Sequence, residues 1–402
     1  MAVIQEPMAV FALCALVCGL VFWAGRVAIF QKLFRVIPSI VFVYYVPAIL
    51  STLGVIPTDS AAYDWMRDYL LPFSLFILMF TADVPAILQI GPRAIAMMLA
   101  GTAGVVVGGP VALLLFSDYL PPDAWKGLAA LSGSWIGGGG NFAALKEAVG
   151  APDTIIGPII VVDTAIGYTW MGILLIGVNF VNRFDRWNGA SAEWFEDLNR
   201  RLREWKEQGR RTIRLEDITA LLAVGFLGAV LFKVSGNLFY SLTSDYMSLH
   251  FPGLASIFSP FTWMVILLTT AGIGLSFTRL REMERAGASE FGYAALYLFL
   301  TSIGAGADLA GLAAAPVLLL VGATWICVHI IFLFAAARLL RSPLFLVAVG
   351  SQANIGGAAS APIVAAAYYE AMAPVGLMMS ILGYLVGNYA GLLCAYLLQL
   401  VA

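Results

Sequence analysis

The chain has 402 residues, of which 61% are hydrophobic and 11% charged, and its formal net charge at pH 7 is −2. Average soluble domains contain roughly 45–50% apolar and about 25% charged residues. So few polar residues cannot cover a globule in water, which excludes a soluble enzyme, a disordered chain and a nucleic-acid-binding protein. The composition predicts an integral membrane protein whose main partner is the lipid bilayer.

Continuous apolar runs predict an all-α polytopic membrane fold. The hydrocarbon core of a bilayer is about 30 Å thick, so a helix needs about 20 apolar residues to cross it. Candidate segments occupy residues 8–25, 36–56, 69–89, 94–117, 125–149, 154–182, 216–240, 256–278, 290–311, 314–338, 343–369 and 374–401.

A charged stretch, residues 183–215, separates the first six segments from the last six. Within it, apolar residues recur at helical spacing between Arg and Glu residues, which is typical of an amphipathic helix on lipid headgroups. A solvated linker helix is the alternative. We predict a first repeat at 1–182, a cytoplasmic amphipathic linker at 183–215 and a second repeat at 216–402. The spaced apolar residues are Trp194, Phe195, Leu198, Leu202 and Trp205.

The two halves carry similar motifs. Gly-Ser at 133–134 followed by Gly-Gly at 139–140 matches Gly-Ser at 350–351 followed by Gly-Gly at 356–357. A shared motif at a corresponding place in both halves indicates an internal duplication.

Loop charges indicate that the halves have opposite orientations, because Lys and Arg in short loops stay cytoplasmic. The loop after the first segment carries Arg26, Lys32 and Arg35, whereas its counterpart after the seventh carries Asp245 and no Lys or Arg. The other paired loops show the same opposite bias. We therefore predict two inverted-topology repeats.

The charge rule also constrains the fifth segment. Asp118 and Asp123 place the preceding loop outside, while the linker at 183–215 belongs inside, so an odd number of crossings must separate them. Two segments lie between. We expect the segment at 125–149 to enter and leave on one side, and 343–369 to do the same. Each half then has about five transmembrane helices plus one glycine-broken or re-entrant element. Broken helices that cross the membrane are the alternative.

The glycine runs are candidate binding elements. An opened helix turn in hydrocarbon leaves backbone groups unpaired, which is tolerated where the backbone lines an aqueous cavity. Close helix packing through small residues is the alternative explanation. In transporters, half-helix ends at such breaks present N–H groups and carbonyls to a ligand. The candidate residues are Ser134, Gly137, Gly138, Gly139, Gly140 and Asn141 in the first half, and Ser351, Gln352, Asn354, Gly356 and Gly357 in the second.

Asp163 is the most informative single residue. It lies within an apolar helix, where a carboxylate costs roughly 3 kcal/mol even on lenient insertion scales. We interpret Asp163 as a cation ligand or proton carrier, with Thr164 beside it; a structural Asp bonded to a helix terminus is the alternative. Asn388 occupies the corresponding helix of the second half. If the ion is Na⁺, then Asp163, Asn141 and Asn354 are its candidate ligands.

Two stretches resemble known proteins. Gly133-Ser-Trp-Ile-Gly-Gly-Gly-Gly-Asn-Phe-Ala-Ala and Gly350-Ser-Gln-Ala-Asn-Ile-Gly-Gly-Ala-Ala-Ser-Ala-Pro look like signatures of the membrane family named domain of unknown function 819. That family is similar to the cation/proton antiporter and anion transporter superfamily, which includes sodium/bile-acid, sodium/glutamate and sodium/citrate symporters. The resemblance implies secondary active transport, by elevator-like movement of a core against a scaffold.

These features predict a Na⁺- or H⁺-coupled transporter of a small organic anion or amino-acid-like solute, with no other cofactor. A cation/proton antiporter and a passive channel are the alternatives. A membrane enzyme is disfavoured, because the intramembrane acids are isolated and no Asp-x-x-Asp, His-Glu-x-x-His or Gly-x-Ser-x-Gly motif occurs. We expect the protein to lie in the bacterial inner membrane. The sequence leaves open whether two copies form a homodimer through scaffold helices.

Overall fold

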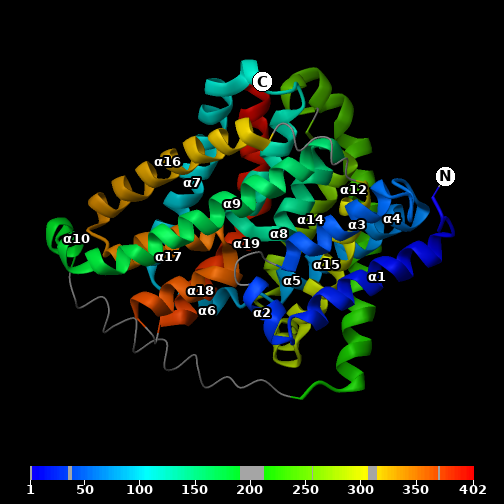
Figure 1. Cartoon of the computed structure of the whole chain (residues 1–402), viewed down its shortest axis with the longest axis horizontal. Coiled ribbons are helices and arrows are strands. Elements are labelled where there is room, and N and C mark those ends of the chain that lie inside the picture. Colours follow the sequence, from blue (N-terminus) through cyan, green and yellow to red (C-terminus); the bar gives the residue numbers. More distant parts are fainter. Residues whose placement is uncertain (1, 35–38, 191–211, 256, 307–314, 370–371) are drawn as a thin grey trace.

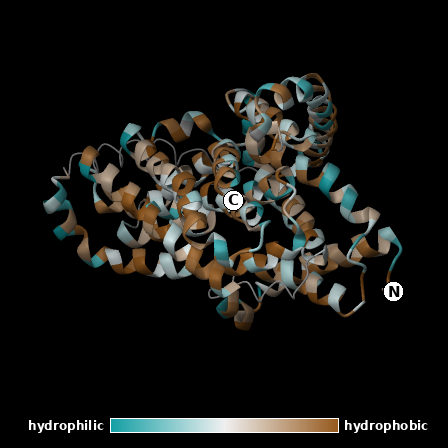
Figure 2. Ribbon diagram, turned by 90° about the horizontal axis from the view of Figure 1, so that it is seen from above, coloured by the Kyte–Doolittle hydropathy of each residue, from teal (hydrophilic) through white to brown (hydrophobic). Residues whose placement is uncertain are grey.

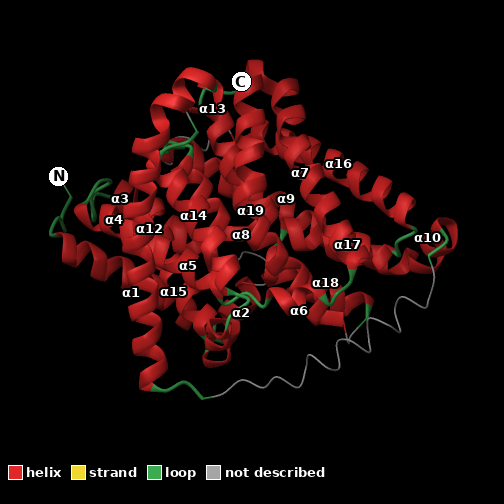
Figure 3. Ribbon diagram, turned by 180° about the vertical axis from the view of Figure 1, so that it is seen from behind, coloured by secondary structure: helices red, strands yellow, loops and turns green. Residues whose placement is uncertain are grey.

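The computed structural model describes residues 2–34, 39–190, 212–255, 257–306, 315–369 and 372–402. Within these ranges every regular element is a helix, which confirms the all-α prediction (Figure 3). The apolar residues of the predicted headgroup helix, between Trp194 and Trp205, lie outside the described residues, as does Arg35.

The helices before the charged stretch follow the predicted segments closely. Several begin with proline in the first turn, where its missing N–H costs nothing. The elements are α1 (Pro7–Ala24), α2 (Ala28–Phe34), α3 (Ser39–Thr52), α4 (Ala61–Trp65), the π-helical turn η1 (Met66–Leu70), α5 (Leu71–Phe80), α6 (Val84–Leu88), α7 (Pro92–Phe116), η2 (Ser117–Tyr119), α8 (Ala124–Ala148), α9 (Asp153–Gly177), η3 (Val178–Phe180) and α10 (Val181–Asn188).

The described residues after the charged stretch are helical as well. Their helices are α12 (Leu215–His250), α13 (Pro252–Ala255), α14 (Pro260–Leu275), η4 (Arg279–Ala286), α15 (Ala288–Gly306), α16 (Ala315–Leu340), α17 (Leu344–Ile355), α18 (Gly357–Tyr368) and α19 (Ala373–Val401). Here α12 extends ten residues past the predicted end at residue 240, because residues 241–251 contain no proline or glycine that would end the helix before Pro252.

The described helices include six that are long and apolar enough to cross a membrane, or up to eight if each of two bent pairs forms one span. The remaining predicted crossings are represented by shorter or less apolar helices. Apolar residues run along most of the ribbon (Figure 2). On α12, Leu227, Leu231 and Val234 are exposed, as expected of a face that meets lipid chains. The protein is an integral membrane protein.

The beginning of the predicted linker is not a separate segment. It folds as α10, and Asn188 Nδ2 donates hydrogen bonds to the carbonyl oxygens of Ala337 (2.9 Å) and Ser342 (2.7 Å). Asp185 Oδ1 accepts from the backbone N–H of Leu344 at 2.7 Å. These bonds dock α10 on the turn between α16 and α17, so the boundary at 182/183 falls inside a packed helix.

The helices pack as two bodies, which lie side by side in Figure 1. The flanking body comprises α1, α3, α5, α12, α14 and α15, and the hairpin body comprises α7, α8, α9, α16, α17, α18 and α19. Each half of the chain therefore contributes helices to both bodies. The most extensive contact between two described helices joins α8 and α19, at the centre of the hairpin body.

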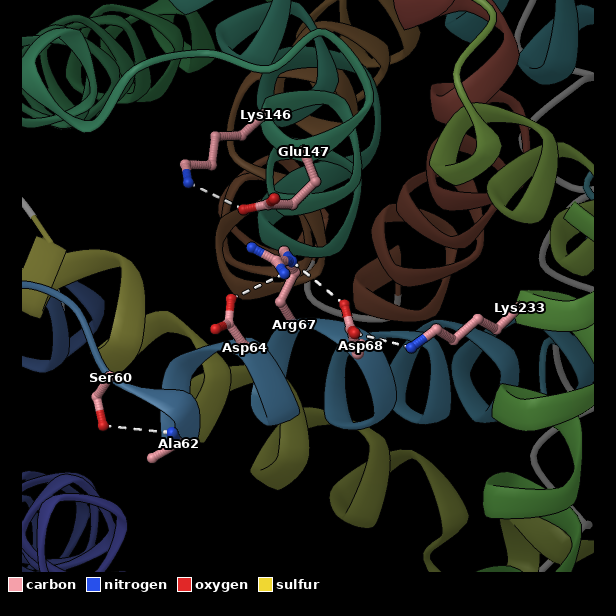
Figure 4. A network of polar contacts seen from close by, with 8 residues as sticks. All are labelled: Ser60, Ala62, Asp64, Arg67, Asp68, Lys146, Glu147 and Lys233. Atoms are coloured by element: carbon pink, nitrogen blue, oxygen red, sulfur yellow. Dashed lines mark hydrogen bonds and ion pairs between the residues drawn. The ribbon is translucent and has the colours of Figure 1, made fainter. Parts of the chain in front are cut away.

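A network of ion pairs lies where η1, which packs on α5, α12 and α15 of the flanking body, faces the end of α8 (Figure 4). Arg67 pairs with Asp64 (2.9 Å) and Asp68 (3.3 Å), and Lys233 of α12 pairs with Asp68 (2.7 Å). At the end of α8, the Glu147 carboxylate faces the Arg67 guanidinium across the gap between the bodies. Charge thus links the two bodies at this level.

Lys146 is the buried cation of this region, and its Nζ lies 2.9 Å from both Glu147 Oε1 and Asp153 Oδ1. We expect Lys146→Met to destabilise the protein by about 3 kcal/mol, because two carboxylates lose their cation in a largely buried place. Thermal unfolding in detergent measures the effect. The control is Lys126→Met, whose more exposed pair with Asp123 contributes about 0–1 kcal/mol. Equal unfolding temperatures of the two variants would contradict this structural role.

Candidate functional site

The glycine run in α8 forms a sharp turn. Gly138 has φ 72° and ψ −167°, outside the helical region, with helix on both sides. A Cβ atom on Gly133 would lie 2.6 Å from the carbonyl oxygen of Asn141, whereas residues eight apart in a straight helix are about 12 Å apart. A Cβ on Gly127 would meet Ile155, at the start of α9, at 2.8 Å. Helix α8 therefore folds back on itself, and we call it the first hairpin.

Helices α17 and α18 form a second hairpin of the same kind. Gly357 has φ 58° and begins α18, with Gly356 alone between it and the end of α17. Gln352 Nε2 donates to Ser360 Oγ at 2.7 Å, again across eight residues. The ring of Phe345, at the start of α17, lies 5.4 Å from that of Tyr369, just after α18. Both predicted breaks are confirmed, and each element begins and ends at the same side of the helix bundle.

The tips of the hairpins meet at Tyr384 of α19. A Cβ on Gly138 would lie 3.1 Å from Tyr384 Cε1, and one on Gly357 would lie 3.4 Å from the Tyr384 hydroxyl. The backbone N–H of Ala358 donates to that hydroxyl at 3.1 Å. One tyrosine side chain therefore touches the turns of both halves.

The hairpins reach this point from opposite ends of α19. Toward the start of α19, Gly376 packs against Ala361 of the second hairpin. Toward its end, Gly391 packs against Leu145 of the first hairpin. Since Tyr384 lies between these contacts, the hairpins point toward each other, tip to tip.

Asp163 lies on α9 beside the first hairpin. Its Oδ2 accepts a hydrogen bond from Ser134 Oγ (2.7 Å), and its Oδ1 accepts one from Trp135 Nε1 (2.9 Å). Both donors belong to the turn of helix that precedes the break, and Asp163 and Thr164 are partly exposed. The carboxylate is thus held at the level of the hairpin tip by these two donors.

Asn141 and Asn388 are joined in one buried chain of hydrogen bonds. Asn141 Nδ2 donates to Asn388 Oδ1 (3.0 Å) and to the carbonyl oxygen of Tyr384 (3.1 Å). Asn388 Nδ2 donates to Thr269 Oγ1 (2.9 Å) on α14. The chain connects the first hairpin through α19 to the flanking body.

Ser351 lies deeper in the hairpin body. Its hydroxyl contacts Trp170 Nε1 and His329 Nε2, each at 2.8 Å. His329 Nδ1 lies 2.9 Å from the carbonyl oxygen of Gly101, so Nδ1 must carry a proton; when the ring is neutral, Ser351 then donates to Nε2. These groups satisfy one another, which indicates a structural role.

Asn354 is also enclosed by protein bonds. Its Oδ1 accepts from Thr102 Oγ1 (2.9 Å), and its Nδ2 donates to the carbonyl oxygens of Met98 (3.0 Å) and Gly350 (2.9 Å). The amide fixes the end of α17 against α7. This geometry favours an anchoring role for Asn354 over the predicted role as a Na⁺ ligand.

The electrostatics of the tips follow from helix geometry. Each hairpin turn joins the carbonyl end of one half-helix to the amide end of the next, and these ends carry partial negative and positive charge. Residues 138–140 are partly exposed and Ala359 is exposed, so backbone at both tips is accessible. The opposed tips therefore offer positions for both a cation and an anion.

Apart from Thr164 and Gln352, the predicted residues divide into two sets. The six glycines Gly137, Gly138, Gly139, Gly140, Gly356 and Gly357 lie at the tips, with Ser134, Asp163, Asn141 and Asn388 nearby, whereas Ser351 and Asn354 serve the packing against α9 and α7. The prediction missed the central position of Tyr384. A signal was available, because glycines at 383, 387 and 391 mark the face of α19 that packs on α8.

Comparison with known proteins places this fold in a family. The family described as "Protein of unknown function (DUF819)" matches residues 12–401. The chain belongs to the DUF819 family. Over 363 residues it is 29% identical to "Uncharacterized membrane protein YjcL" of Bacillus subtilis (strain 168), and the match covers 85% of each chain. The opposed hairpins described above are thus the candidate site of a DUF819 protein, a family to which no substrate is assigned.

Proposed function

We propose that this DUF819 protein is a secondary active transporter of a small organic anion or amino-acid-like solute, coupled to Na⁺ or H⁺. The observation that carries the proposal is the meeting of two oppositely directed, glycine-broken hairpins at Tyr384. Opened backbone at the middle of a membrane protein is tolerated where it handles a polar ligand. The proposed location is the bacterial inner membrane.

The site would use both tips. Asp163 and the carbonyl end of the first half-helix would bind the cation, since Asp163 already accepts two hydrogen bonds that hold it in place. The amide ends after Gly138 and Gly357 would bind the negative group of the solute. Binding of the cation would complete the charge balance that the anion requires.

The two bodies suggest how the site would alternate between membrane sides. In the proposed cycle, repeats at 1–182 and 216–402 have inverted topology, and the hairpin body moves against the flanking body like an elevator. The contacts between α14 and α19, such as that of Thr269 with Asn388, would exchange during this movement. In this cycle α10, the first part of the linker, would move together with the hairpin body.

The test is uptake by proteoliposomes containing the purified protein. Organic anions and amino acids are screened with an imposed Na⁺ gradient, an imposed H⁺ gradient or neither, against protein-free liposomes. Accumulation of a solute above its external concentration, only when an ion gradient is present, supports coupled transport. Exchange of cations for H⁺ without any organic solute would instead identify an antiporter, and non-saturable equilibration would identify a channel. Covalent conversion of the solute would indicate an enzyme.

A further inference from the structure

The side chain of Gln352 carries a buried oxygen without a partner. Gln352 is 1% exposed, and its Nε2 donates to Ser360 Oγ across the turn of the second hairpin. No described residue, by contrast, donates to Gln352 Oε1, which is fully buried. A buried carbonyl oxygen left unpaired has lost its hydration without compensation, so it calls for a ligand.

The other buried polar atoms that lack a hydrogen bond within the described ranges do not offer the same opportunity. The atoms without a bond in Tyr44, Trp263 and Ser342 each carry a proton that they can donate, so none of them is an acceptor alone. Asp153 Oδ1 is ion-paired with Lys146. Asn188 is the last residue of α10, where it bonds the carbonyl oxygens of Ala337 and Ser342 and not a hairpin turn. Gln352 Oε1 is a pure acceptor located at a hairpin turn.

The surroundings of Gln352 are oxygen-rich and close-fitting. A Cβ on Gly356 would overlap both Ser360 Oγ and Gln352 Nε2, so the nitrogen end of the amide lies directly over the turn. The backbone N–H of Gly356 bonds the carbonyl of Gln352 at 2.9 Å, which is the last regular bond of α17. As at any helix C-terminus, the carbonyls of residues 353–355 then point beyond the helix, with the negative end of its dipole.

We propose that this turn holds a monovalent metal cation, with Gln352 Oε1 as a ligand and Ser360 Oγ and α17 carbonyls beside it. Neutral oxygens suit Na⁺, whereas Ca²⁺ and Mg²⁺ require carboxylates. Among the described residues, no group of three or more His, Cys, Asp or Glu side chains is arranged to hold a metal ion. The role of this cation in coupling rests on the proposed transport function; its binding does not.

The proposed cation site uses side chains other than Asp163. Ser351, the residue before Gln352, contacts Trp170, which lies seven residues beyond Asp163 on α9. Ile355, at the end of α17, lies beside Gly167, which is four residues, or about 6 Å of helix, beyond Asp163. The two hairpins therefore carry different devices, a carboxylate at the first and an unpaired amide oxygen at the second.

Na⁺ binding is tested on the full-length protein in detergent, by the unfolding temperature and tryptophan fluorescence as NaCl replaces choline chloride at constant ionic strength. We expect NaCl to stabilise the wild type in a saturable way. Gln352→Met preserves the length of the side chain but removes the oxygen, and should raise the half-saturating Na⁺ concentration at least about tenfold. Gln352→Glu should lower it by about tenfold. The matched control, Gln31→Met, alters an exposed glutamine and should leave the titration unchanged.

Several outcomes would overturn the site. The wild type would show no saturable Na⁺ effect if Gln352 Oε1 binds only water, and Gln352→Met would titrate like the wild type if the ion binds elsewhere. Should Gln352→Met fail to fold, the Gln352→Glu titration decides. Loss of the Na⁺ effect in Asp163→Asn alone would move the ion to the first hairpin. H⁺-driven solute uptake without a Na⁺ effect would leave the transport proposal intact, whereas Na⁺ binding without any uptake would refute transport and keep the site.

Discussion

Replacing Gly138 by alanine should reduce solute uptake at least tenfold. Its φ of 72° and ψ of −167° fall in a region that residues with a side chain essentially never adopt, and forcing one there costs about 1–3 kcal/mol. The new Cβ would also press on Tyr384 at 3.1 Å, where the hairpins meet. Uptake by proteoliposomes and the unfolding temperature measure the two effects.

The matched control for this substitution is one residue away. Gly139 does not have positive φ, and the nearest atom to a Cβ there is Ile40 Cδ1 at 3.6 Å, an ordinary contact. Gly139→Ala should therefore preserve stability and most of the uptake. If Gly138→Ala matched Gly139→Ala in both measurements, the sharp turn would not be needed for transport.

Asp163→Asn should abolish ion-dependent uptake while leaving the protein folded. The amide is isosteric, so its oxygen can still accept from Trp135, and the Ser134 hydroxyl can turn to accept from the new NH₂ group. What disappears is the negative charge that would bind a cation or carry a proton. The readouts are uptake with and without an ion gradient, and the unfolding temperature.

The control is Asp118→Asn, which removes a carboxylate from an exposed position in η2 and should leave coupling unchanged. Ion-driven accumulation by Asp163→Asn at the wild-type level would remove Asp163 from the mechanism. In that case its hydrogen bonds with Ser134 and Trp135 would be purely structural, as the alternative interpretation of the sequence holds.

The sequence predicted the helices and both breaks because these depend on local properties. The length of an apolar run determines whether a helix can cross the membrane. A run such as Gly137 to Gly140 has weak helix propensity, so it favours a break in the helix. It also predicted that residues 125–149 return to their starting side, through loop charges alone. The contact of Gly127 with Ile155 agrees with that prediction.

The partners of individual polar residues could not be predicted, because they depend on which helices become neighbours. Asn354 and Asp163 look similar in the sequence, as isolated polar residues in apolar runs. Only the fold reveals that Asn354 is hydrogen-bonded by α7 and by the carbonyl of Gly350, while Gln352, two residues earlier, has an oxygen left without a partner among the described residues. The docking of α10 was missed for the same reason, since Asn188 is bonded to residues about 150 positions away.

The dominant contact between α8 and α19 has a consequence for biogenesis. The first hairpin leaves the ribosome early, but its main packing partner, α19, is made more than 200 residues later. Until then Asn141 lacks Asn388, and the glycine turn lacks Tyr384. Asn141 and the glycine turn therefore stay without these partners until α19 is inserted, and truncation before α19 would leave both of them unpaired in the bilayer.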